Sequence, residues 1–108
     1  LPAPIDVLPA IADRVGDRTT LIYDSGVRSG VDVARAVALG ADAAFAGKSF
    51  LWSLGALGEK GPAHLIDVYI DDISATLGQL GCRNVDELRD ISVRHPAAYS
   101  AADFSPSE

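Results

Sequence analysis

Apolar residues recur at helical spacing close to the amino terminus. An apolar stripe runs from Pro4 to Val15, Asp13 and Arg14 lie off the stripe, and Gly16 follows as a stop signal. The stripe residues are Ile5, Leu8, Ile11, Ala12 and Val15. Because apolar positions with this spacing share one face of a helix, the pattern predicts an amphipathic helix over this segment.

Two short apolar runs have no helical period. Residues 19–23 are β-branched or apolar without alternation, and residues 43–46 form a second run of this type. Continuous runs of this length are typical of strands that are covered on both faces. The sequence therefore predicts two buried strands, and the first ends at the turn that begins with Asp24.

Two further helices follow from apolar periodicity. One begins near Ser29 or Gly30 and closes at 39–40, where a glycine provides a common terminal signal. The longer one covers 65–80 and ends at Gly81. Its apolar stripe contains Ile66, Tyr69, Ile70, Ile73, Leu77 and Leu80. This stripe is the strongest helical signal in the chain and predicts one buried face.

The carboxyl-terminal part of the chain changes character. Asn84 and Glu87 have the residue types of a capping box, which predicts a short last helix that continues through Ile91. Beyond it the chain is polar and interrupted by prolines, a composition typical of irregular structure. We therefore divide the chain into a folded part, 1–93, and an irregular tail, 94–108.

The predicted order is helix, strand, helix, strand, helix, helix, which is the alternation of an α/β fold. Two parallel strands that are buried on both faces need neighbours, because an isolated pair leaves its edges and faces in water. The pattern therefore predicts part of a larger α/β domain. The sequence also lacks methionine, so we expect that its first residue is not the translated start.

Composition excludes several classes of protein. Of the 108 residues, 48% are hydrophobic and the mean hydropathy is +0.18, which indicates a folded core rather than disorder. The formal net charge is −6, and no basic run is present. These features argue against binding of nucleic acid or an anionic membrane through general electrostatics. Any anion site must therefore be local.

The number of cysteines and the hydropathy of the chain indicate where in the cell the protein is expected. Cys82 is the one cysteine, so an internal disulfide and a cysteine-based metal cluster are both excluded. No apolar run has the length of a membrane span, and the first residues lack the features of a signal peptide. These observations favour a cytoplasmic protein without a bound metal.

Each predicted strand ends in a glycine close to a cation. Arg28 lies between Gly26 and Gly30 after the first strand, and Gly47 precedes Lys48 after the second. Glycine permits close backbone approach and fixed cations bind phosphate, so two such strand ends predict a phosphate clamp. Loops after strands seven and eight of barrel enzymes form such sites. The alternative is that the glycines serve ordinary turns and that both cations are solvated.

Three stretches of the chain can be compared with a known family: Pro2-Ala3-Pro4-Ile5, DSGVRSGVDVARAVALGADAAFAGKSFLWSLGALGEKG, and LGQLGCRNVDEL. Together they resemble the FMN-dependent α-hydroxy acid oxidases and dehydrogenases, a family that includes glycolate oxidase, lactate oxidase, lactate dehydrogenase and mandelate dehydrogenase. The resemblance implies an α/β fold: the C-terminal part of a (β/α)8 TIM barrel, about its last two strands with their helices, completed by an upstream segment.

The resemblance also implies cofactor-binding residues. The first segment that contacts the phosphate and ribityl chain of FMN would be Asp24, Ser25, Gly26, Val27 and Arg28, and the second would be Gly47 and Lys48. At the position of Lys48 the family usually has arginine. The lysine of this chain therefore replaces a planar, two-pronged donor with a point charge. Ser25 replaces a glycine that is common in the family.

The catalytic residues of the family are expected upstream. Its members carry a catalytic histidine and a substrate-binding arginine in a His-Gly-Gly-Arg segment that this chain lacks, so we assign no catalytic residue here. Other chemically suggestive residues receive structural interpretations: His64 and His95 at the surface, Asp71 and Asp72 on a solvated face, Cys82 in a tight connection, and Trp52 at the barrel rim or against a neighbouring subunit.

By resemblance, the complete enzyme oxidises a small 2-hydroxy acid to a 2-oxo acid by transfer of a hydride equivalent to FMN. Its expected partners are the N-terminal part of the same polypeptide, present as a companion fragment, and further copies of itself in a tetramer or octamer. Two alternatives remain at this point. One is another FMN-dependent barrel such as a type 2 isopentenyl diphosphate isomerase, and the other is a non-catalytic module that binds a phosphorylated ligand.

Overall fold

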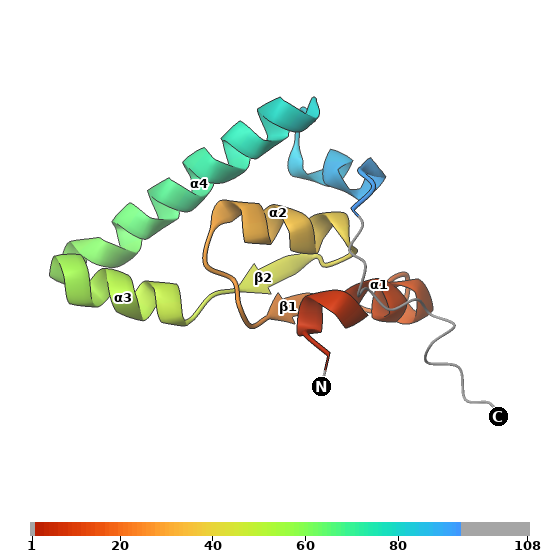
Figure 1. Ribbon diagram of the computed structural model, residues 1–108, viewed down its shortest axis with the longest axis horizontal. Coiled ribbons are helices and arrows are strands. Elements are labelled where there is room, and N and C mark those ends of the chain that lie inside the picture. Colours follow the sequence, from red (N-terminus) through yellow and green to blue (C-terminus); the bar gives the residue numbers. More distant parts are fainter. Residues whose placement is uncertain (1, 94–108) are drawn as a thin grey trace.

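The computed structural model describes residues 2–93. Along the chain it contains α1 (Pro4–Val15), β1 (Ile22–Asp24), α2 (Gly30–Ala38), β2 (Ala43–Phe45), α3 (Lys48–Leu57), η1 (Gly58–Lys60), α4 (Gly61–Leu80) and η2 (Val85–Asp90), where η marks a 3-10 helix (Figure 1). The predicted irregular tail, 94–108, and His95 lie outside the described residues.

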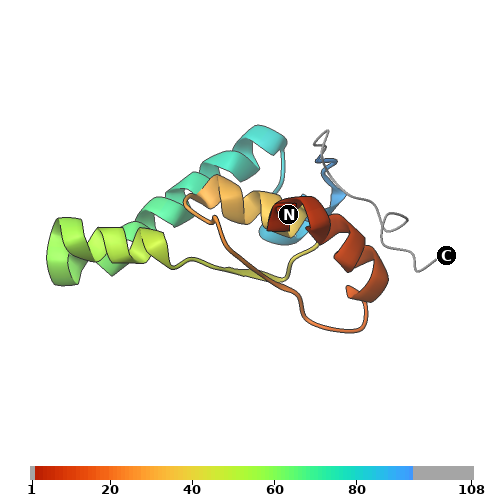
Figure 2. The same cartoon turned by 60° about the horizontal axis from the view of Figure 1, so that its bottom comes forward.

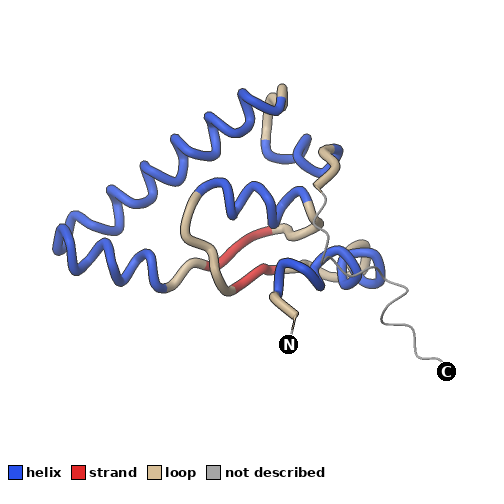
Figure 3. The backbone as a smooth tube through the Cα atoms, in the orientation of Figure 1, coloured by secondary structure: helices blue, strands red, loops and turns tan. Residues whose placement is uncertain are grey.

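The two strands lie side by side and run parallel, with α2 as the crossover between them (Figure 3). Ile22 pairs with Ala43, and Asp24 pairs with Phe45. Side chains alternate between the faces of a strand, so the central residue of β1, Tyr23, points opposite to its neighbours. It packs against a buried cluster of Leu8 from α1, Ala36 from α2 and Ala41. Both helices therefore cover one face of the strand pair, as the turned view in Figure 2 also shows.

The other face of the strand pair is open. Ile22 is 50% exposed and Phe45 is 59% exposed. Within the described chain, helices therefore cover one face of each strand, and the covering of the other face by the rest of a larger α/β domain stays a prediction. Each strand has three residues with the pattern exposed, half-buried, exposed, because helices lie on one side alone. The first strand also starts later than predicted, at Ile22 instead of Thr19.

Most predicted helices are present, and their ends follow local chemistry. Helix α1 has the predicted bounds. Helix α2 begins after Ser29, whose hydroxyl accepts a hydrogen bond from the Asp32 amide at 3.2 Å. Helix α4 starts at Gly61, before the predicted Leu65, because Pro62 extends the helix at its amino end. It ends at Gly81 in the left-handed conformation, as the glycine signal predicted.

Helix α3 was not predicted, and it forms a V-shaped pair with α4 (Figure 1). Its apolar side chains do not form a stripe that separates a buried from an exposed face: Leu51 and Trp52 are 67% and 56% exposed. The prediction of a buried stripe on α4 holds in part. Tyr69 is buried, but Ile66, Ile70 and Leu80 are 48%, 54% and 44% exposed, because α2 and α3 cover one side of this helix alone.

The last element, η2, packs against α2. Leu88 is 1% exposed and lies in a second buried cluster with Ala34 and Val37. The predicted cap is present, since the Asn84 side chain accepts from the Glu87 amide at 3.1 Å. The helix is a 3-10 helix, and the Glu87 carboxylate accepts from the Arg83 amide at 2.7 Å rather than closing the second half of the capping box. No helix within residues 2–93 combines the length and apolarity needed to cross a membrane.

Candidate functional site

The carboxyl ends of β1 and β2 open onto one cavity of about 270 Å³. This is expected, because parallel strands end at the same edge of a sheet. The cavity is lined by Asp24, Ser25, Gly26, Val27, Arg28, Phe45, Gly47 and Lys48. All seven residues that the sequence predicted for cofactor binding therefore lie around one space, and Phe45 is the addition.

The loop after β1 has an unusual backbone. Ser25 has φ of 95° and Gly26 has φ of 74°, so two consecutive residues lie in the left-handed region. The Asp24 carboxylate accepts a hydrogen bond from the Ser25 amide at 2.8 Å, which stabilises this turn. A non-glycine residue in this region is strained, and strained residues concentrate at ligand sites. The turn carries the chain across the edge of the cavity.

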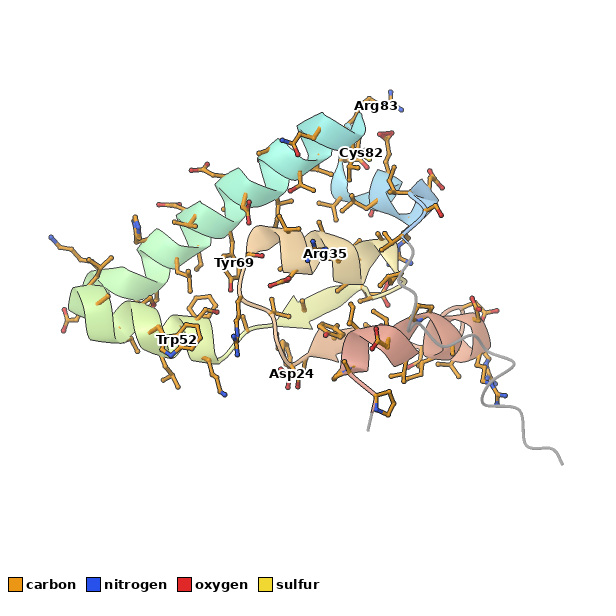
Figure 4. The ribbon with its side chains drawn as sticks, in the orientation of Figure 1. Asp24, Arg35, Trp52, Tyr69, Cys82 and Arg83 are labelled. Carbon is orange, nitrogen blue, oxygen red and sulfur yellow. The ribbon has the colours of Figure 1, made fainter. Side chains whose placement is uncertain are left out.

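Arg28 is held at both its backbone and its side chain. Its amide donates to the Asp32 carboxylate at 2.9 Å, which ties the residue to the first turn of α2. Its guanidinium carbon lies 5.4 Å from the ring centroid of Trp52 on α3, within the range of a cation–π interaction. Figure 4 shows Trp52 on the surface of α3 beside the strand ends. The first cation of the cavity is thus stacked on an aromatic ring.

Lys48 enters the cavity from the first residue of α3, and Gly47 is the residue before the helix. The positive end of a helix dipole and free backbone amides favour an anion at this position. A Cβ added to Gly47 would have no neighbour within 4 Å, so the backbone borders open space. A lysine, a helix amino terminus and an exposed glycine backbone therefore meet at the second strand end.

The charges and the size of the cavity define what it can hold. Arg28 and Lys48 supply positive charge, whereas Asp24 supplies an acceptor that suits hydroxyl groups. The volume is below the roughly 300–1,000 Å³ of pockets that bury entire drug-sized ligands. Two cations beside a cavity of this size suit a small anionic group such as a phosphate.

A second, larger cavity of about 650 Å³ shares Ser25 and Gly26 with the first. Tyr23 lines it, and burial raises the pKa of this phenol, with further contributions from the negative charges of Asp32 and Asp6. The phenol is therefore neutral and can act as a hydrogen-bond donor into this space.

The structure also places the residues that we had interpreted as structural. The expectation that Asp71 and Asp72 share a solvated face holds for Asp71 alone. Asp72 is half-buried, because it accepts a hydrogen bond from the Val31 amide at 3.1 Å and fixes the start of α2. His64 is exposed on the first part of α4, and Cys82 is half-buried against the second cluster. No group of three or more potential metal ligands occurs within residues 2–93.

Sequence reasoning missed two residues behind the cavity, Ser49 and Tyr69. The Ser49 hydroxyl lies 2.7 Å from the Tyr69 hydroxyl, and both are buried. The available signal was a phenol on an otherwise aliphatic stripe of α4, since a buried tyrosine hydroxyl needs a polar partner. The identity of that partner could not be read from the sequence.

Known proteins are similar to this chain in sequence and in fold. Residues 1–95 match the family described as FMN-dependent dehydrogenase. The L-lactate dehydrogenase of Bartonella quintana is 46% identical over 81 residues, which cover 75% of this chain and 21% of that protein. The human 2-hydroxyacid oxidase 1 is 39% identical over 101 residues, which cover 93% of this chain and 27% of the oxidase.

A solved oxidase structure is also similar to this chain. A mandelate oxidase with (S)-mandelic acid has a TM-score of 0.79 and 32% identity over 83% of this chain, which corresponds to 27% of that enzyme. The chain thus spans about a quarter of the length of the proteins it matches. Since the family match covers residues 1–95 and the fold is similar to that of a mandelate oxidase, the chain belongs to the FMN-dependent dehydrogenase family.

Proposed function

We propose that this chain is the C-terminal portion of an FMN-dependent 2-hydroxy acid oxidase or dehydrogenase. In this proposal residues 1–93 form the last two strands of a (β/α)8 barrel with their helices, and the N-terminal part of the same polypeptide completes the barrel. Two observations support it. The chain spans about a quarter of its relatives, and one face of its strand pair is open, with Ile22 and Phe45 exposed.

The proposed role of the chain is to hold FMN. Arg28 and Lys48 bind the phosphate, because they are the cations around the cavity at the two strand ends. Asp24 and Ser25 contact hydroxyl groups of the ribityl chain, for which their oxygens are suitable partners. Gly26, Val27 and Gly47 bring the backbone close to the ligand. The observation that carries the proposal is that all seven residues line one cavity.

FMN, when bound, supplies the redox chemistry by accepting a hydride equivalent from the α-carbon of a small 2-hydroxy acid, which becomes a 2-oxo acid. The residues of this chain fix the phosphate end of the cofactor. In the proposal the histidine that removes the hydroxyl proton and the arginine that binds the substrate carboxylate belong to the upstream part. The contribution of this chain is therefore orientation and affinity.

The proposal is tested by the affinity of the complete apo-protein for FMN. Each charge-assisted hydrogen bond to phosphate contributes roughly 1.5–3 kcal/mol, so Arg28→Ala and Lys48→Ala should each weaken FMN binding about tenfold or more. Arg35→Ala is a matched control, because Arg35 is an exposed arginine of α2 that does not line this cavity. Flavin fluorescence titration measures all three. Unchanged affinity in both site variants would remove the basis of the proposal.

A further inference from the structure

A buried group of three polar atoms lies behind the proposed FMN site. The hydroxyls of Ser49 and Tyr69 are 2.7 Å apart. The Ser49 and Tyr69 hydroxyl oxygens lie 3.3 Å and 3.4 Å from the carbonyl oxygen of Val27, so either hydroxyl can donate to it. Ser49, Tyr69 and Val27 are 5%, 9% and 4% exposed, so water does not compete at this position. We call these three residues the hydroxyl bridge.

The hydroxyl bridge is internally satisfied. Each hydroxyl has one proton, and two protons suffice for a closed arrangement in which one hydroxyl donates to the other and that one donates to the carbonyl. No buried side-chain nitrogen or oxygen within residues 2–93 lacks a partner. Removal of either hydroxyl leaves a buried oxygen with fewer partners, which disfavours the present position of the loop.

The hydroxyl bridge connects the neighbours of both proposed phosphate ligands. The Val27 carbonyl belongs to the peptide bond that leads into Arg28, and Ser49 directly follows Lys48. Tyr69 belongs to α4. It follows Val27 by 42 residues and Ser49 by 20 residues in the sequence. A single phenol thus contacts the residues beside both cations.

The position of Tyr69 is itself fixed by packing. Its ring meets Phe50 of α3 edge to face, with centroids 6.2 Å apart and planes at 63°. Helix α2 begins directly against its backbone, since a Cβ added to Gly30 would lie 2.6 Å from the Tyr69 carbonyl oxygen. The Val31 amide also donates to Asp72, one turn further along α4, at 3.1 Å. The phenol is therefore presented from a rigid support.

We propose that Tyr69 and Ser49 are positioning residues that hold Arg28 and Lys48 at the spacing required by one phosphate group. This inference rests on the proposed function. The loops need such support, because each strand before them has three residues and the loops contain the flexible residues Gly26 and Gly47. A site that must be ordered when the ligand binds loses affinity. The hydroxyl bridge orders the site beforehand.

The test compares FMN with riboflavin, which lacks the phosphate. Tyr69→Phe keeps the ring and its contact with Phe50 but removes the hydroxyl, and Ser49→Ala removes the other one. Each should weaken FMN binding by the complete apo-protein by about three- to tenfold and leave riboflavin affinity unchanged. The matched control is Ser53→Ala, because the Ser53 hydroxyl donates at 2.7 Å to Phe50 within the same helix, outside the bridge. It should change neither affinity.

A second measurement separates positioning from general stability. In the Arg28→Ala, Lys48→Ala double variant, Tyr69→Phe should cause no further loss of FMN affinity, since there is no pair of cations left to position. Equal losses for FMN and riboflavin, or unchanged FMN affinity in both bridge variants, overturn the inference. If circular dichroism shows that Tyr69→Phe does not fold, the FMN and riboflavin affinities of Ser49→Ala alone test the inference.

The two proposals fail in different ways. If Arg28→Ala and Lys48→Ala leave FMN affinity unchanged, the proposed function is wrong and the inference falls with it. If those variants lose affinity while Tyr69→Phe and Ser49→Ala behave like Ser53→Ala, the proposed function stands and the hydroxyl bridge has no role in binding.

Discussion

The guanidinium of Arg28 has two potential contacts in this molecule, the Trp52 ring and an anion in the cavity. Stacking at 5.4 Å restricts the long side chain to one side of the strand ends. Both residues are exposed, so the stacking contributes about 0.5–1 kcal/mol. Trp52 was expected at the barrel rim or against a neighbouring subunit, and its contact with Arg28 adds a direct connection to the cavity.

From this contact we predict that Trp52→Leu weakens FMN binding by about two- to fivefold, because Arg28 loses its restraint. Trp52→Phe should retain most of the affinity, since a phenyl ring also attracts a cation. Leu51→Ala, next in sequence and exposed, serves as the control and should have no effect. Titration of FMN into each apo-protein measures the change. Equal behaviour of Trp52→Leu and Leu51→Ala would show that the stacking is irrelevant to binding.

For Lys48 we predict a substitution that retains FMN affinity. Lys48→Arg should be tolerated, because it installs the residue usual in the family and keeps the positive charge at the amino end of α3. FMN affinity should stay within about threefold of the original value, because the donor geometry alone changes. Loss of FMN binding with an unchanged circular dichroism spectrum would assign Lys48 a role that requires a compact ammonium group.

At the scale of elements, the end of α4 depends on one glycine. Gly81 has φ of 75°, and the Cys82 amide next to it donates back to the Leu77 carbonyl at 2.9 Å. A side chain at this φ is strained even where space is available. Gly78, in the last turn of the same helix, has space around it and no positive φ.

We therefore predict opposite effects for these two glycines. Gly81→Ala should lower the free energy of unfolding by about 1–2 kcal/mol, through left-handed strain. Gly78→Ala should raise it by roughly 0.5–1 kcal/mol, since alanine loses less backbone entropy in a helix. Urea unfolding followed by circular dichroism compares them. A stabilised Gly81→Ala protein would contradict the conformation described for this helix end.

A second element-scale connection joins η2 to the start of the strands. The Asp42 carboxylate accepts from the Leu21 amide at 2.8 Å and from the Arg89 guanidinium at 2.7 Å, and Arg89 also donates to the Ala41 carbonyl. The Leu21 amide and then Arg89 hold the pKa of Asp42 below its ordinary value of 3.8. The ionised carboxylate is therefore the form that suits the fold.

The sign of the resulting pH dependence follows. A carboxylate whose pKa is lowered by folding contributes stability above its ordinary pKa, and this contribution is lost as the pH falls through the folded value. We predict that Asp42→Asn reduces stability at neutral pH and that the difference from the original protein shrinks as the pH falls below 3.8. Urea unfolding across this range tests it. A difference that stays constant with pH would exclude Asp42 ionisation as the cause.

The elements differ in how far the sequence could predict them. The bounds of α1, the ends of α2 and the carboxyl end of α4 were predictable, because prolines, serine caps and terminal glycines act locally. The amino end of α4 was placed four residues too late. Helix α3 was missed, since its apolar residues do not separate into two faces. The seven cavity residues came from the family motif. The Tyr69–Ser49 contact was not predictable, because it depends on how α4 packs.

At the scale of the whole molecule, exposed apolar surface is the dominant feature. It includes Ile22 and Phe45 on the strand pair and Leu51, Leu54 and Leu57 on α3. Contiguous surfaces of this kind mark contacts with other protein. In the proposed barrel, upstream strands cover the open face of the strand pair. The homo-oligomer remains a prediction, and the apolar residues of α3 are available for it.

We predict that the amides of β1 and β2 exchange slowly with deuterium when the upstream part is present. Denaturing mass spectrometry of the same sample should reveal that part, either in the same polypeptide or as a larger fragment with His-Gly-Gly-Arg or a close variant. Ile22 is 50% exposed, so covering the rest of it contributes about 0.7–1.5 kcal/mol. Ile22→Asp should weaken the association by more than this, because it also buries a charge. Slow exchange in the 108-residue chain by itself would contradict an incomplete barrel and favour a non-catalytic module.

The sequence separation within the hydroxyl bridge also sets an order of events during biosynthesis. Val27 is made first, Ser49 follows, and Tyr69 is added 42 residues after Val27. At about 5–20 residues per second, the ribosome takes a few seconds to cover this interval. In that period the two cation-bearing loops exist without the phenol that joins them. In the proposed site, the two cations therefore gain the support of Tyr69 only after α4 has been made and docked. Until then we expect a nascent chain to bind FMN about three- to tenfold more weakly than the finished one.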